Sequence, residues 1–256
     1  MQNLLTALLT NLGQAVTAAP KVRIRREHKF MVRRQLLVQL TADLAPFVVD
    51  DSHNIANCHY YKVASIYFDN HALRNYLDKV NGLARRLKTR VRFYPSSSTG
   101  MYFVEFKYKQ GDLSVKHKSQ VTETDIKQLL AGNYPSFFKS KNQVLTSFAR
   151  HLFSNSMFPF VRIDYVRQAF LAKYGLPLRI TIDSQVRCCR YRKDFYGHAP
   201  HIRALPANSA ILEIKTEGTY PFWLVAILQK YGLKQEAVSK YVYSVQALAR
   251  TSSLSL

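Results

Sequence analysis

Rows of charged side chains run along several segments whose composition is typical of β-strands. Successive side chains of a strand point to opposite faces, so residues two positions apart share a face. In residues 179–186, for example, a charged row lies opposite an apolar row of Ile180, Ile182 and Val186. The charged rows are Arg25, Glu27 and Lys29; Lys88, Arg90 and Arg92; Glu105, Lys107 and Lys109; Ser114, Lys116 and Lys118; Arg179, Thr181 and Asp183; and Glu213, Lys215 and Glu217. Converging rows of this kind could neutralise a dense linear anion, and a chain of phosphate groups fits that description.

Two arrangements explain these rows. In the first, each charged row is a solvated face of an open sheet whose apolar face lies on helices, which is the ordinary arrangement for any single strand. In the second, the strands close into a barrel, the charged rows converge inside it, and helices wrap its apolar exterior. Each further strand that repeats the pattern favours the second arrangement.

The net charge also indicates an anionic partner. Lys and Arg number 37 against 16 Asp and Glu, which gives a formal charge of +21. A charge so far from zero opposes compaction unless anions bind, and nucleic acid, polyphosphate, nucleotides, phosphoinositides and an anionic membrane all qualify. The three cysteines have neither the even number of a disulfide set nor zinc-site spacing. No apolar run reaches the roughly 18 residues of a membrane span. We therefore expect a cytoplasmic protein with reduced thiols.

Hydrophobic periodicity predicts one α+β domain of about eight antiparallel strands with about six peripheral helices. The predicted strands are residues 22–32, 62–69, 86–94, 101–110, 113–122, 160–172, 178–183 and 210–217. The predicted helices are residues 33–47, 71–82, 122–132, 141–153, 221–232 and 239–249. Residues 1–21 are expected to form a separate N-terminal helix, and no linker divides residues 22–256.

Short stretches spread along the chain resemble one known family. In order they are REHKF, SIYFDN, TRVRFY, VEFKYK, SVKHK, YVRQAF, LRITID, ILEIKT and VSKY, and together they span about residues 22–248. They look like the VTC domain, the polyphosphate polymerase branch of the triphosphate tunnel metalloenzyme (CYTH-like) superfamily. The resemblance implies an eight-stranded antiparallel β-barrel, or tunnel, that binds triphosphate or polyphosphate with a divalent metal, Mn²⁺ or Mg²⁺. It also implies transfer of the terminal phosphate of ATP to a growing polyphosphate chain.

Carried over position by position, the resemblance implies a set of site residues. The catalytic cations would be Lys29, Arg90, Arg92, Lys107, Lys116, Arg167, Arg179, Lys215 and Lys240. Lys88, Lys118 and Ser239 would bind substrate, and Glu213 would hold the metal. The first strand departs from the ExExK pattern of the wider superfamily, because Arg25 stands in place of its first acidic residue. We therefore expect Glu27 and Glu105 to be ion-pair partners of the cations rather than metal ligands.

Other functions stay open at this stage. A polyphosphate or tripolyphosphate hydrolase would need the same cations and a metal-binding carboxylate, whereas a non-catalytic polyphosphate-binding module would need the cations alone. Eukaryotic family members carry transmembrane segments and an inositol-pyrophosphate-binding module, so we expect a prokaryotic stand-alone domain with a separate membrane partner. The expected ligands are ATP and polyphosphate, with no specific nucleic acid. The expected location is the cytoplasm, with the inner face of the membrane as an alternative.

Overall fold

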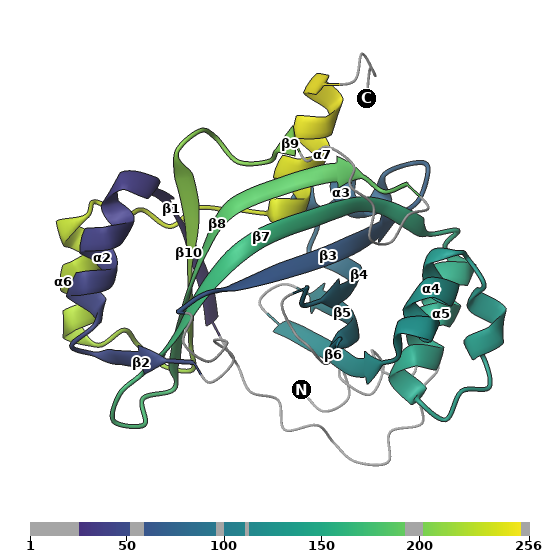
Figure 1. The fold of residues 1–256 in the computed structure, drawn as a ribbon, viewed down its shortest axis with the longest axis horizontal. Helices are drawn as coiled ribbons and strands as arrows, with labels where there is room; N and C mark the ends of the chain where they lie inside the picture. Colours follow the sequence, from purple (N-terminus) through teal and green to yellow (C-terminus); the bar gives the residue numbers. More distant parts are fainter. Residues whose placement is uncertain (1–25, 52–58, 96–99, 111–112, 193–201, 252–256) are drawn as a thin grey trace.

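The computed structural model describes residues 26–51, 59–95, 100–110, 113–192 and 202–251. The helix expected in residues 1–21 lies outside these ranges. Within them, the chain folds around one antiparallel sheet of ten strands (Figure 1). The sheet order is β1-β10-β8-β7-β3-β4-β5-β6, with β2 paired to β7 and β9 paired to β8. The strands are β1 (Arg26–Arg33), β2 (Val48–Asp50), β3 (Tyr61–Asp69), β4 (Arg85–Phe93), β5 (Tyr102–Gln110), β6 (Leu113–Val121), β7 (Phe158–Ala172), β8 (Leu178–Arg190), β9 (Ile202–Arg203) and β10 (Ser209–Thr216).

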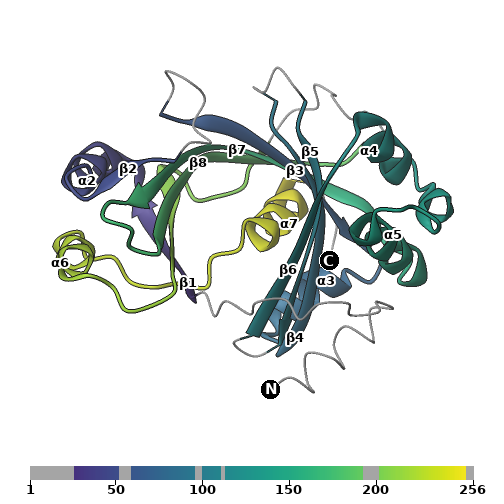
Figure 2. The same cartoon turned by 90° about the horizontal axis from the view of Figure 1, so that it is seen from below.

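The sheet is curled but open, which differs from the expected closed barrel of eight strands. Its end strands β1 and β6 do not pair with each other in the described part of the chain. Figure 2 shows the sheet as an arch that is open on one side. A side-chain contact spans the opening between β1 and β5, because Lys107 Nζ on β5 lies 3.1 Å from Glu27 Oε2 on β1. The antiparallel α+β class is confirmed, and closure into a barrel is not.

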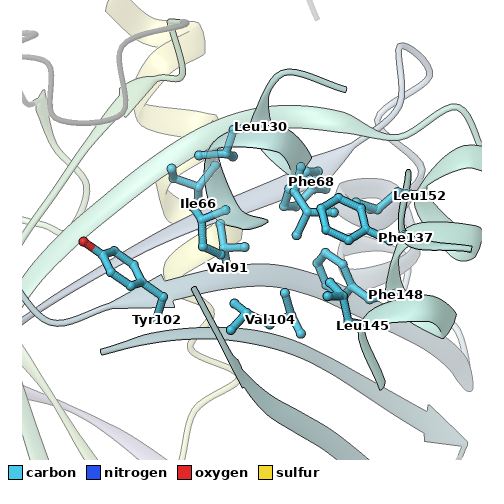
Figure 3. Packing of buried hydrophobic residues seen from close by; sticks show 14 of the residues in the cluster. Ile66, Phe68, Val91, Tyr102, Val104, Leu130, Phe137, Leu145, Phe148 and Leu152 are labelled. Carbon is cyan, nitrogen blue, oxygen red and sulfur yellow. The ribbon is translucent and has the colours of Figure 1, made fainter. Parts of the chain in front are cut away.

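Two helical layers cover the convex face of the arch. Helices α2 (Leu37–Leu44) and α6 (Phe222–Lys230) lie on β1, β10 and β8, where they bury Ile180, Leu212 and the other apolar residues of those strands. Helices α4 (Glu123–Leu130) and α5 (Gln143–Ser154) lie on β4, β5 and β6. Figure 3 shows this second layer, in which Phe148 and Leu152 of α5 pack with Phe68 and other strand residues. The apolar rows predicted for these strands therefore face the helices.

Helix α7 (Lys240–Thr251) lies on the concave face instead, so not all helices are peripheral as expected (Figure 2). Its residues Tyr241 and Val245 pack with Val161 and Ile163 of β7. The pairing of β7 with β8 shifts register near Gln185, which has a positive φ of 52°. Beyond this bulge Val186 joins the concave core, whereas Ile180 and Ile182 belong to the convex one. The concave surface of β7 and β8 is thus partly apolar, and α7 covers that part.

Local signals set several helix boundaries. Thr122 and Asp125 form a capping box at the start of α4, and the Asn142 side chain accepts a hydrogen bond from Leu145 N at the start of α5. The short helix α3 (Arg74–Val80) connects β3 to β4, and 3₁₀ turns occupy Arg34–Leu36 and Tyr134–Phe137. No helix among the described residues is long and apolar enough to cross a membrane.

Candidate anion-binding site

The charged rows meet on the concave face because the opposite rows are fixed under helices. Strand register sets their neighbours: Lys29 on β1 pairs with Glu213 on β10, which pairs with Thr181 on β8. On the other side of the arch, Arg90 on β4 pairs with Glu105 on β5. Most of the predicted cations form ion pairs with a few carboxylates on this face. Those carboxylates are Glu27, Asp51, Glu105, Asp183 and Glu213.

Glu213 and Glu27 join the cations of β1, β10 and β5. Lys29 Nζ lies 3.1 Å from Glu27 Oε1 and 3.4 Å from Glu213 Oε2, so one ammonium group contacts both carboxylates. Lys215 Nζ lies 2.5 Å from Glu213 Oε1. Burial raises the pKa of Glu213, but Lys215, Lys29 and other cations outweigh it and hold that pKa well below its usual range. Burial and Glu213 likewise raise the pKa of Glu27, and Lys29, Lys215 and Lys107 nevertheless lower it to about 2.

Glu105 holds three cations of β4 and β6. Its Oε2 accepts hydrogen bonds from Arg90 Nε at 2.8 Å and Arg90 Nη2 at 2.6 Å, while Lys116 Nζ donates to Oε1 at 3.0 Å. Arg92 Nη1 lies 3.9 Å from Oε1. Burial raises the pKa of this 2% exposed carboxyl, but the three cations outweigh it and hold the pKa far below normal. Burial lowers the pKa of Lys116 to about 8 despite the pairing. Glu27 and Glu105 thus form ion pairs, as expected.

Asp183 holds a third group of cations where β7, β8 and α7 meet. Arg167 donates to both of its oxygens, at 2.6 Å and 2.7 Å, and Lys240 at the start of α7 contacts Oδ2. The Asp183 side chain is fully buried, which raises its pKa, but Arg167 and Lys240 more than reverse this effect. Ser239 precedes Lys240 and is also buried. Arg167 and Lys240 are therefore held beside each other.

Arg179 and Thr181 retain unused polar atoms. Arg179 Nη2 contacts Asp51 Oδ2 at 2.7 Å, but its buried Nε has no hydrogen-bond partner. The hydroxyl of Thr181 also has no partner, although only 1% of the residue is exposed. Thr181 lies between Glu213 of β10 and Ala169 of β7 in the sheet register. A buried donor without a partner is costly, so these two groups fit a ligand that brings acceptor oxygens.

Two predicted substrate-binding lysines, Lys88 and Lys118, do not form ion pairs with the carboxylates of this face in the described part of the chain. Lys88 pairs in register with Lys107, and it has no ion-pair partner among the described residues. Burial and the charges of Lys29, Lys79 and Arg90 lower its pKa to about 7. Lys118 is exposed, and its ammonium lies 3.7 Å from the centre of the Phe103 ring. Lys118 therefore stacks on an aromatic ring instead of joining a carboxylate group.

A network of tyrosines supports the cations. Tyr67 Oη accepts a hydrogen bond from Arg90 Nη1 at 2.7 Å, and Tyr165 Oη accepts one from Arg92 Nη2 at 3.1 Å. Tyr67 also stacks on Tyr241 of α7, with ring centroids 5.3 Å apart. Sequence reasoning assigned no role to these residues, and it placed Thr181 and Asp183 in a charged row without a function. Strand parity could have suggested Tyr67 and Tyr165, but contact with α7 could not be inferred from local sequence.

The residues present are compatible with a metal that is shared with a phosphate ligand. No group of three or more His, Cys, Asp or Glu side chains that could hold a metal occurs among the described residues. However, Glu213 and Glu27 both contact the single cation of Lys29, so two carboxylates converge on one position. Mg²⁺ and similar ions are commonly held by one or two carboxylates together with substrate phosphates. The donor set therefore fits such a metal, with Glu213 as the more buried carboxylate.

Comparison with known proteins identifies a family. The sequence profile of a family described as the VTC domain matches residues 24–249, nearly the whole chain. Comparison with curated proteins gave no match. A solved structure of a candidate adenylate cyclase from Bacillus halodurans has a TM-score of 0.50 and 12% identity, over 85% of this chain and 94% of its own. Another, from Vibrio parahaemolyticus, has a TM-score of 0.47 and 11% identity, over 86% and 96%. At such identities the likeness to the first structure concerns the fold alone.

Proposed function

The chain belongs to the VTC domain family, and from this premise we propose that it is a polyphosphate polymerase. It would transfer the terminal phosphate of ATP to a growing polyphosphate chain. The observation that carries this proposal is the surplus of cations on the concave face, where three groups of Lys and Arg share a few buried carboxylates. Such a surplus is stable only with an anion, and a linear phosphate chain supplies closely spaced charges.

The cations suit phosphoryl transfer because that reaction depends on positioning and charge stabilisation. The proposed step forms a bond between a terminal oxygen of the polyphosphate chain and the γ-phosphorus of ATP. It breaks the bond from that phosphorus to the β-phosphate oxygen, which leaves with ADP, so the chain gains one phosphate. Arg90, Arg92 and Arg167 offer forked donors to phosphate oxygens, and Lys29, Lys215 and Lys240 offer compact charges. The carboxylates keep these cations in place before the ligand binds.

Mn²⁺ or Mg²⁺, held by Glu213 together with the phosphates, would supply further charge neutralisation there when bound. Glu213 itself is held between Lys29 and Lys215. This position also fits a simple counter-charge, which favours a second candidate function, a non-catalytic polyphosphate-binding module. The two functions require the same cations and differ in whether turnover occurs.

Parallel assays separate the candidate functions. The purified chain is mixed with Mn²⁺ and either ATP or tripolyphosphate, the products are resolved on a gel that detects long phosphate chains, and polyphosphate binding is measured alongside. Long chains together with equimolar release of ADP support the polymerase. Release of orthophosphate from tripolyphosphate without chain growth would identify a hydrolase. Binding of polyphosphate with neither reaction would identify a binding module.

Replacing Glu213 tests its role directly. We expect Glu213→Gln to bind tripolyphosphate as well as the parent chain but to lose metal-dependent turnover by orders of magnitude, because the amide is a poor metal ligand. Turnover and binding are measured at saturating Mn²⁺, with the exposed Glu236→Gln as control. If Glu213 is only a counter-charge, the variant binds phosphate more tightly and turns over within a few-fold of the parent.

The same geometry leads us to propose that phosphate chains are preferred over duplex nucleic acid. The cations lie on the concave side of a sheet, partly covered by α7, rather than on one exposed helix. Displacement of bound polyphosphate by short duplex DNA at equal charge concentration would contradict this preference. A separate membrane protein as partner also remains a proposal, which co-purification from native membranes would test.

A further inference from the structure

A second group of cations lies beyond the carboxylates, at the start of β4. Lys79 on α3, Arg86 on β4 and Lys109 on β5 are all half-buried, and we call them the outer basic cluster. Arg86 and Lys109 are direct partners in the register of β4 and β5. Lys79 belongs to the helix that leads into β4, and α3 and β4 are in contact.

The outer basic cluster continues the charged row of β4. Arg86, Lys88, Arg90 and Arg92 are successive members of one face of this strand. Four residues of strand separate Arg86 from Arg90, or roughly 13 Å. Moving from Arg90 towards Arg86, the partners on β5 change from Glu105 to Lys107 and then to Lys109. The row therefore leads without interruption from the carboxylate-paired cations to the outer basic cluster.

Like charges face each other along this stretch. Lys88 opposes Lys107, and Arg86 opposes Lys109. Like charges directly opposite each other in a sheet are destabilising. In the described part of the chain, no carboxylate forms an ion pair with Lys79, Arg86 or Lys109. Burial, followed by the charges of Arg86, Lys29 and Lys109, lowers the pKa of Lys79. Half-buried cations without counter-charges cost stability unless an anion occupies the space beside them.

The opposite end of the same strand pair is aromatic. Near Arg92, Tyr94 and Phe103 contact each other with ring centroids 6.0 Å apart, and the exposed Lys118 lies over the Phe103 ring. A chain of phosphates gains little from these rings and one exposed lysine, whereas the Arg86 end offers three half-buried cations with no ion pair in the described ranges. In the described part of the chain, half-buried cations without a carboxylate partner therefore lie towards the Arg86 end of β4 and β5.

We propose that the outer basic cluster binds the part of a linear polyphosphate chain that extends past the phosphates held by Arg90 and Arg92. This proposal rests on the proposed function for its ligand class, inorganic polyphosphate. It adds a second binding site and a direction, with the chain running along β4 towards α3. A chain longer than a triphosphate is needed to contact both sites.

Binding measured as a function of chain length tests the proposal. The variant Lys79→Gln/Arg86→Gln/Lys109→Gln is compared with the parent for sodium tripolyphosphate and for a long-chain polyphosphate. We expect tripolyphosphate affinity within twofold of the parent and long-chain affinity at least tenfold weaker. The slope of log affinity against log salt for the long chain should fall by about 2, by analogy with single-stranded nucleic acids, because three cations are removed.

A matched variant controls for net charge. Lys127→Gln/Lys139→Gln/Lys141→Gln removes the same charge from the convex α4–α5 side of the molecule and should leave both affinities unchanged. Because removal of opposed like charges relieves repulsion, the outer-cluster variant should melt no lower than the parent without ligand. Equal losses for both ligands, or no loss for the long chain, would overturn the proposal.

The proposed function can fail independently of this inference. If the parent makes polyphosphate but its affinity for the long chain does not depend on the outer basic cluster, the inference is refuted and the polymerase proposal is kept. If binding depends on polyphosphate length and requires the cluster, but the protein makes no polyphosphate from ATP, the inference is kept and the polymerase proposal is refuted.

Discussion

Individual carboxylates organise the cations of the concave face. Glu105 contacts Arg90, Arg92 and Lys116, and Asp183 contacts Arg167 and Lys240. Each buried carboxylate therefore holds more positive charge than it neutralises. Removing one partner of a buried ion pair is strongly destabilising, because the other charges remain uncompensated. The acidic residues thus fix the positions of donors whose remaining hydrogen-bonding capacity is available to a ligand.

The hydroxyl of Thr181 provides a test of this availability. Thr181→Val keeps the side-chain shape and removes a buried hydroxyl that has no partner. We expect unchanged stability or a gain of up to about 1 kcal/mol without ligand, because an unsatisfied polar group disappears. Tripolyphosphate affinity should fall roughly tenfold, the value of one hydrogen bond to a charged group. Thermal melting and calorimetric binding measure the two effects.

Thr89→Val is the matched control for Thr181. Thr89 is equally buried and its hydroxyl also lacks a partner, but it alternates with Arg90 and so faces the convex helical layer. This variant should show the same change in stability with no change in phosphate affinity. A loss of affinity in both variants, or in neither, would show that the Thr181 hydroxyl does not contact the ligand.

Lys88 makes phosphate binding depend on pH. Burial and the charges of Lys29, Lys79 and Arg90 lower its pKa to about 7, although Glu27 acts in the opposite direction. Unliganded Lys88 is therefore largely neutral above pH 7, and binding of an anion restores its proton. Tripolyphosphate affinity should fall as the pH rises above 7, with proton uptake approaching one per site near pH 8. Calorimetry in two buffers of different ionisation enthalpy measures this uptake.

Lys88→Arg isolates that proton from those exchanged by the ligand. An arginine stays charged at this pH. On binding tripolyphosphate, the variant should therefore take up fewer protons than the parent, and the difference is the contribution of Lys88. Tripolyphosphate exchanges its own protons equally with both proteins, and the difference between them cancels this effect. Identical uptake by the two proteins would mean that Lys88 is already charged before binding.

At the scale of elements, α7 carries functional residues into the concave face. Lys240 opens the helix and Ser239 precedes it, while the following residues pack on β7 and β8. Asp69 at the end of β3 anchors the helix, because its buried carboxylate accepts a hydrogen bond from Tyr241 Oη. The same carboxylate accepts hydrogen bonds from the backbone N–H groups of Asn75 and Tyr76 in α3. One acidic side chain therefore links β3, α3 and α7.

Tyr241→Phe tests this link. The substitution removes the hydroxyl that donates to Asp69 and leaves the ring stacked on Tyr67. We expect a loss of about 1–3 kcal/mol in stability, because a buried carboxylate loses a donor. Tripolyphosphate affinity should also fall, because Lys240 loses its fixed position. The half-buried Tyr243 on the same helix is the control, and Tyr243→Phe should change stability by less than about 0.5 kcal/mol. Unchanged tripolyphosphate affinity in Tyr241→Phe would show that the hydrogen bond from Tyr241 to Asp69 does not position Lys240 for binding.

At the scale of the whole molecule, sequence periodicity predicted the strands better than their assembly. Alternation in β4, β5 and β10 correctly separated the charged faces from the apolar faces, because each of these strands has one face fixed under helices. Closure of the sheet depends on long-range geometry that no strand encodes alone, and the strands that the structure describes do not close into a barrel. The bulge at Gln185 moved Val186 to the concave face, since period-two reasoning fails after an inserted residue. The position of α7 and the pairing of Asp183 with Lys240 likewise depend on tertiary packing.

The net charge of +21 makes stability itself a reporter of the ligand. A ligand that binds only the folded chain stabilises it by about 2.7 kcal/mol at a hundredfold excess over its Kd. For a domain of this size, that free energy corresponds to a rise in Tm of roughly 5–10 °C. We expect tripolyphosphate to produce this shift and orthophosphate at equal ionic strength to produce much less, because one phosphate cannot contact several of the cation groups together. Thermal melting with sulfate as a further control measures the effect. Equal shifts from all three anions would reduce the interaction to general screening of repulsion among the cations.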